Sequence, residues 1–394
     1  MPSGIFTTFL RLGLTSFGGP IAHLGYFREE FVVRRAWLSE AGFAQLLAIA
    51  QALPGPASSQ LGFAVGLLRG GWAGGLLAFI GFTLPSALLL FGLALLAPRL
   101  EGPTAFAVLH GLKLVAVVVV AHGLAGMIRS LVPDLSRALL AGLALVVMLA
   151  GGPAWRQLAM IAAGGLLGLW LCRGVPRLPA EELAVGHGRR IAWMLLALFG
   201  VGLVLALLVA DGPASLASLA AAFYEAGALV FGGGHVVLPL LEQSTVATDW
   251  IGGQDFLAGY GAAQAVPGPM FSLAAYLGAL VPTGQLPAAG AAVALLAIFL
   301  PGLLLMAALL PLWSRLARQS WAPPVIAGIN AAVVGLLAAA FLGVVLPAGV
   351  HGGGDAAVAL IGLALLASGR VNVLWVVATV VATTVVLQAS SASL

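Results

Sequence analysis

Few side chains in this sequence of 394 residues could bind or react, and the most unusual is a lone lysine. Lys113 lies within an apolar run, where an ammonium group needs an anionic partner or a water-filled cavity. Arg11 and Glu225 also lie within apolar runs. A fixed positive charge in such a setting is typical of an anion-binding site. The alternatives are that Lys113 extends to a polar surface, and that Arg11 and Glu225 form an ion pair.

A second source of positive charge is the backbone, because glycine and proline interrupt the apolar runs. In "LTSFGGPIAHL" the Gly-Gly-Pro sequence predicts a helix that ends at Phe17 and another that begins at Pro20. Similar interruptions predict helix starts at Pro56, Gly234 and Pro269. The free N–H groups and positive ends of such helices bind anions, and glycine lets anion oxygens approach the backbone. The alternative is that the interruptions only allow close helix packing.

No enzyme motif accompanies these residues. The sequence lacks the G-x-x-x-x-G-K-[ST], H-E-x-x-H, C-x-x-C and G-x-S-x-G patterns, which argues against an ATPase and the common hydrolases. "HGGGD" at 351–355 resembles a hydrolase oxyanion loop but has no nucleophile elbow, so we interpret it as an external loop. We therefore expect no enzyme activity, no cofactor and no metal site.

The composition indicates what surrounds these residues: 61% of the chain is hydrophobic, 8% is charged, and the mean hydropathy is +1.11. Soluble proteins average about 25% charged residues, so the sequence predicts an all-α protein that crosses the membrane several times. The net charge of +4 is not clustered into a basic face, and no nucleic-acid partner is expected. Cys172 is the only cysteine, which excludes an intramolecular disulfide.

The order of the motifs indicates an internal repeat. "FGG" at 17–19 recurs at 231–233, and "AQALPGP" at 50–56 recurs as "AQAVPGP" at 263–269. Two further matches follow in the same register: Pro85 with Pro301, and "HGLKLVAVVV" at 110–119 with "AGINAAVVGL" at 327–336. Four matches in register are more than chance would give.

Loop charges predict that the two repeats are inverted in the membrane. The loop after the first interruption carries Arg28, Arg34 and Arg35, whereas the equivalent loop at 242–255 has acidic residues and no Arg or Lys. By the positive-inside rule these loops lie on opposite sides of the membrane. An added helix at 191–210 would turn the second repeat over.

The predicted organisation has three parts. Residues 1–172 form a first membrane repeat, 173–218 form a cytoplasmic linker and a connecting transmembrane helix, and 219–394 form the second, inverted repeat. We expect nine full spans and four re-entrant elements, although 4–26 and 41–68 could instead be full, broken spans. Inverted repeats with interrupted helices are typical of secondary transporters, whose binding site lies near mid-membrane between the repeats.

As a set, these motifs resemble the chromate ion transporter family in its long, duplicated form. The resemblance rests on "SFGGP" at 16–20, "QALPGP" at 51–56, "HGLK" at 110–113, "FGGGH" at 231–235 and "AQAVPGP" at 263–269. It implies export of chromate from the bacterial cytoplasm across the inner membrane, with sulfate as a look-alike. The second repeat departs from the first, because Gly234 replaces the proline of FGGP and Asn330 replaces Lys113.

The expected function is secondary export of a tetrahedral dianion such as chromate, driven by the membrane potential or by ion exchange. A dianion that leaves an inside-negative cell gains about 4.6 kcal/mol at 100 mV, enough for a concentration gradient of about three decades. The alternatives are a sulfate or oxyanion uptake or exchange carrier, an anion channel, and a membrane-embedded enzyme on anionic lipid. The expected partners are the anion and the lipid bilayer. The sequence does not decide whether the protein forms a homodimer.

The candidate binding residues comprise the interruptions, the polar residues that flank them, and the residues at depth in the apolar runs. They are Arg11, Gly18, Gly19, Pro20, His23, Gln51, Pro54, Gly55, Pro56, Lys113, Gly232, Gly233, Gly234, His235, Gln264, Pro267, Gly268, Pro269 and Asn330. Glu225 is expected to act as a gate or a counter-charge. Core packing is the alternative for the two histidines, and capping of broken backbone is the alternative for the two glutamines.

Overall fold

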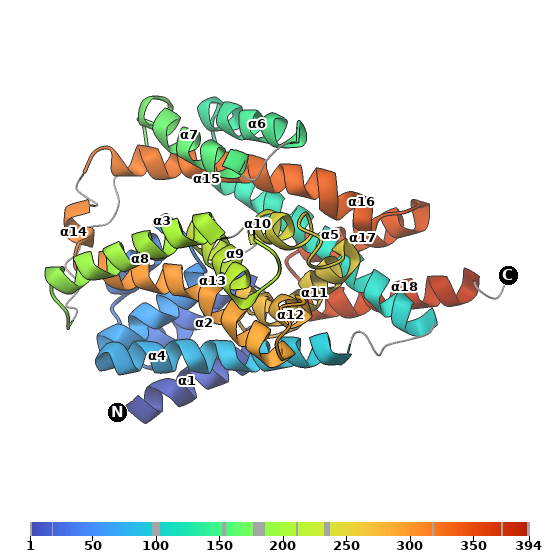
Figure 1. Ribbon diagram of the computed structural model, residues 1–394, viewed down its shortest axis with the longest axis horizontal. Helices are drawn as coiled ribbons and strands as arrows, with labels where there is room; N and C mark the ends of the chain where they lie inside the picture. The colour runs from blue at the N-terminus through green and yellow to red at the C-terminus, as the bar shows by residue number, and fades with distance from the viewer. Residues whose placement is uncertain are drawn as a thin grey trace.

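The computed structural model describes residues 2–17, 19–96, 103–151, 155–175, 186–209, 212–231, 237–316, 319–371 and 373–391. Within these ranges the chain forms helices joined by short connections, and no β-strand occurs (Figure 1). Helices suit apolar segments because they satisfy the backbone N–H and C=O groups within one segment. The predicted all-α polytopic fold is confirmed.

The helices follow the same order in the two halves of the chain. The first half contains α1 (Pro2–Thr15), α2 (Gly19–Arg28), the π-helix η1 (Glu29–Arg34), α3 (Glu40–Ala52), α4 (Ala57–Leu96), α5 (Pro103–Leu131), α6 (Leu135–Leu149) and α7 (Trp155–Leu171). The single helix α8 (Arg189–Val209) follows. The second half contains α9 (Leu216–Leu229), α10 (Val237–Thr245), α11 (Gly253–Ala265), η4 (Met270–Ser272), α12 (Leu273–Leu280), α13 (Pro287–Leu309), α14 (Trp313–Leu316), α15 (Ala322–Ala340), η5 (Phe341–Val345), α16 (Leu346–Gly349), α17 (Gly353–Ala367) and α18 (Val373–Ser391).

Local sequence explains where several of these helices begin and bend. Ser39 caps α3 by accepting a hydrogen bond from the N–H of Gly42 at 3.0 Å, and Asp134 caps α6 by accepting one from the N–H of Arg137 at 2.9 Å. The long helix α4 is bent at Gly70 and Gly71, where the φ angles are −145° and 59°. Its two parts therefore correspond to the separate helices α12 and α13 of the second half.

Five of the described helices are long and apolar enough to cross a membrane by length and composition: 57–96, 106–131, 189–209, 287–309 and 322–349. Six shorter apolar helices accompany them. Both α6 and α17 have 15 residues and are therefore about 22 Å long, less than the ~30 Å hydrocarbon core of a bilayer. The expected total of nine full spans therefore stays a prediction.

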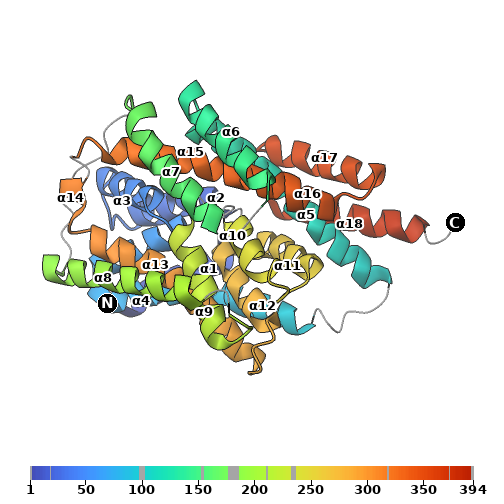
Figure 2. The ribbon, with the colours of Figure 1, turned by 45° about the horizontal axis from the view of Figure 1, so that its top comes forward.

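The last helices of each half pack against a helix of the other half, and we call them the exchanged helices. The first-half helices α6 and α7 pack along α15, and the second-half helices α17 and α18 pack along α5 (Figures 1 and 2). The helices α4 and α12 join the halves at the centre, and the added helix α8 packs on α9 and α13. The folded core is thus shared by both halves of the chain.

Close glycine contacts recur at equivalent places in the two halves. A methyl group on Gly66 would collide with the carbonyl of Gly74, and a methyl group on Gly278 would collide with the carbonyl of Gly290. Small residues let neighbouring helices approach closely in a membrane, where packing rather than water drives association. The recurrence supports the predicted repeat, while its inversion in the membrane stays a prediction.

Candidate functional site

The first predicted interruption is confirmed. Helix α1 ends at Thr15 and α2 begins at Gly19, which leaves Ser16 and Phe17 between them in non-helical backbone. The carbonyl oxygen of Ser16 accepts two hydrogen bonds, from the N–H of Gly268 at 2.9 Å and from Nε2 of His23 at 3.2 Å. The broken backbone of the first half is therefore satisfied by the Pro-Gly-Pro turn of the second half.

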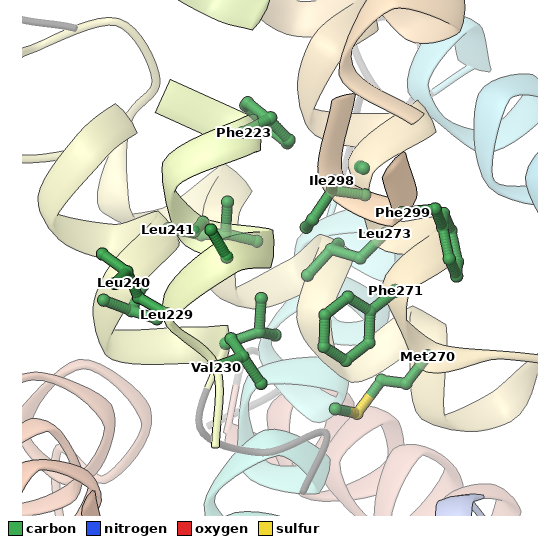
Figure 3. Packing of buried hydrophobic residues seen from close by; sticks show 14 of the residues in the cluster. Phe223, Leu229, Val230, Leu240, Leu241, Met270, Phe271, Leu273, Ile298 and Phe299 are labelled. Atoms are coloured by element: carbon green, nitrogen blue, oxygen red, sulfur yellow. The ribbon is translucent and has the colours of Figure 1, made fainter. Parts of the chain in front are cut away.

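The equivalent contact joins the first Pro-Gly-Pro turn to the interruption of the second half. Helix α9 ends at Leu229, and the carbonyl oxygen of the next residue, Val230, accepts a hydrogen bond from the N–H of Gly55 at 2.7 Å. Figure 3 labels Val230 together with Phe271 of η4, both members of the main core cluster. Each Pro-Gly-Pro turn thus crosses over to the interruption in the opposite half.

We call these two places the crossings and define them by their residues. The first crossing comprises Ser16, His23, Thr83, Ser86, Gly268 and Ser272. The second crossing comprises Gly55, Gln60, Val230 and Gly302. The prediction that interruptions and Pro-Gly-Pro turns meet is confirmed for the part of the chain that the structure describes.

Only glycine fits at the centre of each turn. Gly55 has a φ of 121° and Gly268 a φ of 99°, in the region that other residues rarely adopt. A Cβ on Gly55 would lie 2.9 Å from Nε2 of Gln60, and a Cβ on Gly268 would lie 2.9 Å from Oγ of Ser86. One expectation needs correction: the N–H groups of these two glycines donate to backbone carbonyls and are not free to bind an anion in this conformation.

Side chains that sequence reasoning missed line both crossings. In the second crossing, Nε2 of Gln60 donates to the carbonyls of Pro54 at 2.8 Å and Gly302 at 3.1 Å. In the first, the hydroxyls of Ser86 and Ser272 lie 2.7 Å apart. The match between Pro85 and Pro301 could have pointed to Ser86 and Gly302, because each follows one of these prolines.

Buried polar atoms without a partner gather at the crossings. Among the described residues seven buried side-chain N or O atoms lack a hydrogen-bond partner, and five of them lie in the crossings or, for Ser59, on the residue next to Gln60. They are Oγ of Ser16, Nδ1 of His23, Oγ1 of Thr83, Oγ of Ser59 and Oε1 of Gln60. Because each such atom costs about 1–3 kcal/mol, a concentration of them indicates a place where a polar ligand could supply the missing bonds.

His23 is the best-positioned of the predicted side chains. It is completely buried in α2, donates from Nε2 to Ser16, and its ring meets the ring of Phe82 edge-on at 5.3 Å. Gln264 is also buried, and its Nε2 lies 2.9 Å from Sδ of Met270 across the second Pro-Gly-Pro turn. That contact joins two side chains and satisfies no backbone group, so the role of Gln264 stays a prediction. Arg11 and Gln51 are exposed on α1 and α3.

The structure places Lys113 away from the crossings. Its Nζ donates to Oε1 of Gln254 at 3.1 Å in the first turn of α11, next to Asp255. The Pro-Gly-Pro turn lies beyond the opposite end of α11, a 13-residue helix about 20 Å long. The hydrogen-bond partner of Lys113 is therefore a protein amide. The expectation that Lys113 binds the anion together with the Pro-Gly-Pro turns does not match this arrangement.

The remaining predicted residues are distributed over several helices. The side chain of Asn330 is buried in α15 and its Oδ1 has no partner, whereas Glu225 is half-buried in α9. Gly19 and Pro20 open α2, and Pro54, Pro56, Pro267 and Pro269 are buried in their turns. The remaining expectations, for Gly18, Gly232, Gly233, Gly234 and His235, lie outside the described residues.

One carboxylate was assigned to an outer loop but lines a cavity instead. Glu242 belongs to α10 and, with Gln157 of α7, lines a cavity of about 190 Å³. The other lining residues come mainly from α6, α15 and η5. The sequence around Glu242 carries no signal for this position, because the cavity depends on helices from both halves.

The chain is similar in sequence to several known proteins. The chain is 30% identical over 356 residues to a probable chromate transport protein of Synechococcus elongatus, covering 84% of this chain and 81% of the relative. It is 27% identical to the chromate transport protein of Pseudomonas aeruginosa (85% and 79% covered) and 29% identical to that of Cupriavidus metallidurans (85% and 80% covered). No solved structure gave a significant match.

A family model described as Chromate transporter matches the chain twice, over residues 3–169 and 217–386. The two matches begin 214 residues apart, the same distance that separates the two FGG motifs, and together they span most of the sequence. The family and the long apolar helices identify an integral membrane protein. The chain therefore belongs to the Chromate transporter family.

Proposed function

We propose that this protein exports chromate, or a closely similar tetrahedral oxyanion, across the inner membrane of a bacterial cell. The observation that carries the proposal is the group of unpartnered polar atoms at the crossings. Hydroxyl groups such as those of Ser16 and Thr83 can donate to anion oxygens in any direction, because the O–H bond rotates. The named activity of the relatives supplies the substrate class.

The helix ends around the crossings would add to this site. The first N–H groups of α2 and α4 have no carbonyl one turn earlier in their own helix, and they carry the positive end of the helix dipole. Ser58 and Ser59 in the first turn of α4 are buried beside the second crossing. An oxyanion there would be held by hydroxyls and backbone N–H groups, with no full positive charge required.

Lys113 would then act on the path that the anion follows to or from the crossings, and not in the binding site itself. Its ammonium group is 7% exposed and is held by Gln254 at the first turn of α11. An anion that leaves the crossings along α11 would meet this charge about one helix length away. We assign Lys113 to attracting or releasing the anion at that end.

Export is the energetically favoured direction for a dianion. Moving two negative charges out of an inside-negative cell at 100 mV releases about 4.6 kcal/mol, so no ATP is required. Inward transport would need several coupled cations. Glu242, which lines the cavity, and Glu225 are half-buried carboxylates that could bind such cations.

The function is tested by chromate flux into vesicles reconstituted with the purified protein. We expect uptake that saturates with chromate concentration, responds to an imposed potential and is competed by sulfate. Flux that rises linearly with concentration would indicate a channel. Sulfate flux that is faster and insensitive to chromate would indicate a sulfate carrier, and the proposal would then be wrong.

We also propose that the two repeats are inverted in the membrane. The loop charges support this arrangement, because Arg28, Arg34 and Arg35 have no basic counterpart in the equivalent loop at 242–255. The reciprocal crossings, the paired glycine contacts and the two matches to one family model support the underlying repeat. The inversion would place the Pro-Gly-Pro turns near mid-membrane, entering from opposite sides.

Cysteine labelling tests the inversion. Ala41, at the start of α3, and Ala247, after α10, are both exposed, and the only natural cysteine, Cys172, is buried. In a Cys172→Ala background, an impermeant thiol reagent should label the Ala41→Cys variant from the cytoplasmic side and the Ala247→Cys variant from the outside. Labelling of both variants from the same side would show that the repeats are parallel.

A further inference from the structure

Three side chains able to bind a metal ion meet at the start of α17. His110 of α5 contacts Asp355 of α17, with 2.9 Å between Nε2 and Oδ1. His351 precedes the same helix, and its ring stacks on that of His110 with centroids 5.3 Å apart and an interplanar angle of 18°. One ligand atom from each residue lies within 4.8 Å of the other two.

The cluster joins parts of the chain that the sequence presents separately. His110 belongs to "HGLK" in the first half, and the other two residues belong to "HGGGD" in the second. They meet because α17 packs along α5, as the exchanged helices in Figure 2 show. The "HGGGD" segment is therefore not an isolated loop.

The cluster offers more possible metal ligands than its one close pair, His110 with Asp355, uses. Nδ1 of His351 is 4.0 Å from Oδ2 of Asp355, too far for a hydrogen bond, and two stacked imidazoles leave ring nitrogens available to a metal ion. Two imidazoles and one carboxylate suit Zn²⁺ and related ions, whereas Ca²⁺ and Mg²⁺ prefer oxygen ligands.

A metal ion could reach this site from solvent, and the ligand side chains could rotate to bind it. The side chain of His351 is 58% exposed, so solvent reaches the cluster and could supply a fourth ligand. Zn–N distances are about 2.0–2.1 Å, so the three ligand atoms would need to draw closer by small side-chain rotations. The backbone N–H of His351 donates to Oδ2 of Asp355 at 2.9 Å and holds that carboxylate in place, as an outer hydrogen bond does in known metal sites.

We propose that His110, His351 and Asp355 form a binding site for a divalent transition-metal ion of the Zn²⁺ class. The bound ion connects α5 of the first half to α17 of the second half. Because it binds the folded protein, it stabilises the contact between these exchanged helices. The site is separate from both crossings and does not depend on the proposed substrate.

The test uses Co²⁺ as a spectroscopic substitute for Zn²⁺ on the purified, chelator-treated full-length protein. We expect one Co²⁺ per chain to bind with a visible absorption band that Zn²⁺ removes, and the melting temperature to rise with Zn²⁺ concentration. The His351→Ala and Asp355→Asn variants should bind at least about tenfold more weakly and lose the Zn²⁺-dependent rise in melting temperature.

A matched control is available on the same helix. His122 is an exposed histidine of α5 outside the cluster, and the His122→Ala variant should bind Co²⁺ like the parent protein. Because His351 is largely exposed, its replacement should leave the metal-free melting temperature unchanged. Absence of saturable Co²⁺ binding, or equal binding in the parent and both cluster variants, would overturn the proposal.

Discussion

Alanine in place of Gly268 or Gly55 is expected to abolish chromate transport while leaving the protein inserted in the membrane. Both glycines have φ angles near or above 100°, where a Cβ is strained, and in both cases the added Cβ would lie 2.9 Å from a neighbouring side-chain atom. The turn would have to move, and the hydrogen bond to Ser16 or Val230 in the opposite half would break. Flux into reconstituted vesicles measures the loss.

Gly284 provides the control for this experiment. It also has a positive φ, 72°, but no atom lies within 4 Å of its Cβ position. The Gly284→Ala variant therefore carries backbone strain without a collision, and we expect it to transport chromate. Size-exclusion chromatography of each variant distinguishes loss of transport from loss of folding, because a folded variant elutes as a single species. Near-normal flux in both the Gly55 and Gly268 variants would show that the crossings have no role in transport.

Removal of the Thr83 hydroxyl is expected to weaken the apparent affinity for chromate by about 10–100-fold without lowering stability. Thr83→Val keeps the side-chain shape, and Oγ1 of Thr83 is buried without a hydrogen-bond partner. A merely structural role therefore predicts equal or higher stability, because an unpaired polar group is removed. A hydrogen bond to an anion contributes about 1.5–3 kcal/mol, which gives the expected change in affinity.

Two measurements decide the role of Thr83: the melting temperature in detergent and the concentration dependence of chromate flux. Thr384→Val is the matched control, because Thr384 is buried in α18 and its Oγ1 donates to the carbonyl of Val380 at 2.8 Å. That variant should lose some stability and keep its affinity. If Thr83→Val leaves the affinity unchanged, the anion does not contact this hydroxyl.

Much of the fold could be predicted because the signals were local. The stretches 18–20 and 54–56 combine glycine, which is flexible, with proline, which removes a backbone donor, so both breaks lie within a few residues of the predicted positions. The repeat was visible because the motifs recur in order. The bend in α4 at Gly70 and Gly71 was not predicted, since paired glycines in an apolar run are also common in straight membrane helices.

The candidate site was predicted in outline and not in its contacts. The motifs identified Gly55, His23 and Gly268, but the partners of these residues come from the opposite half of the chain. Sequence gives no direct measure of such distant pairing. The same reason explains why Lys113 was placed with the helix ends: its depth in a span was visible, whereas its contact with Gln254, 141 residues away, was not.

The exchange of helices between the halves also sets the order of assembly during synthesis. Helix α7 ends at Leu171 and its packing partner α15 begins at Ala322, 151 residues later. At about 5–20 residues per second, a ribosome needs about 8–30 s to make that intervening chain. For this interval Gly164 and Gly168, which contact α15 in the finished protein, must face lipid or another temporary neighbour. The first half is thus synthesised before its own core can close, and the last helices complete it.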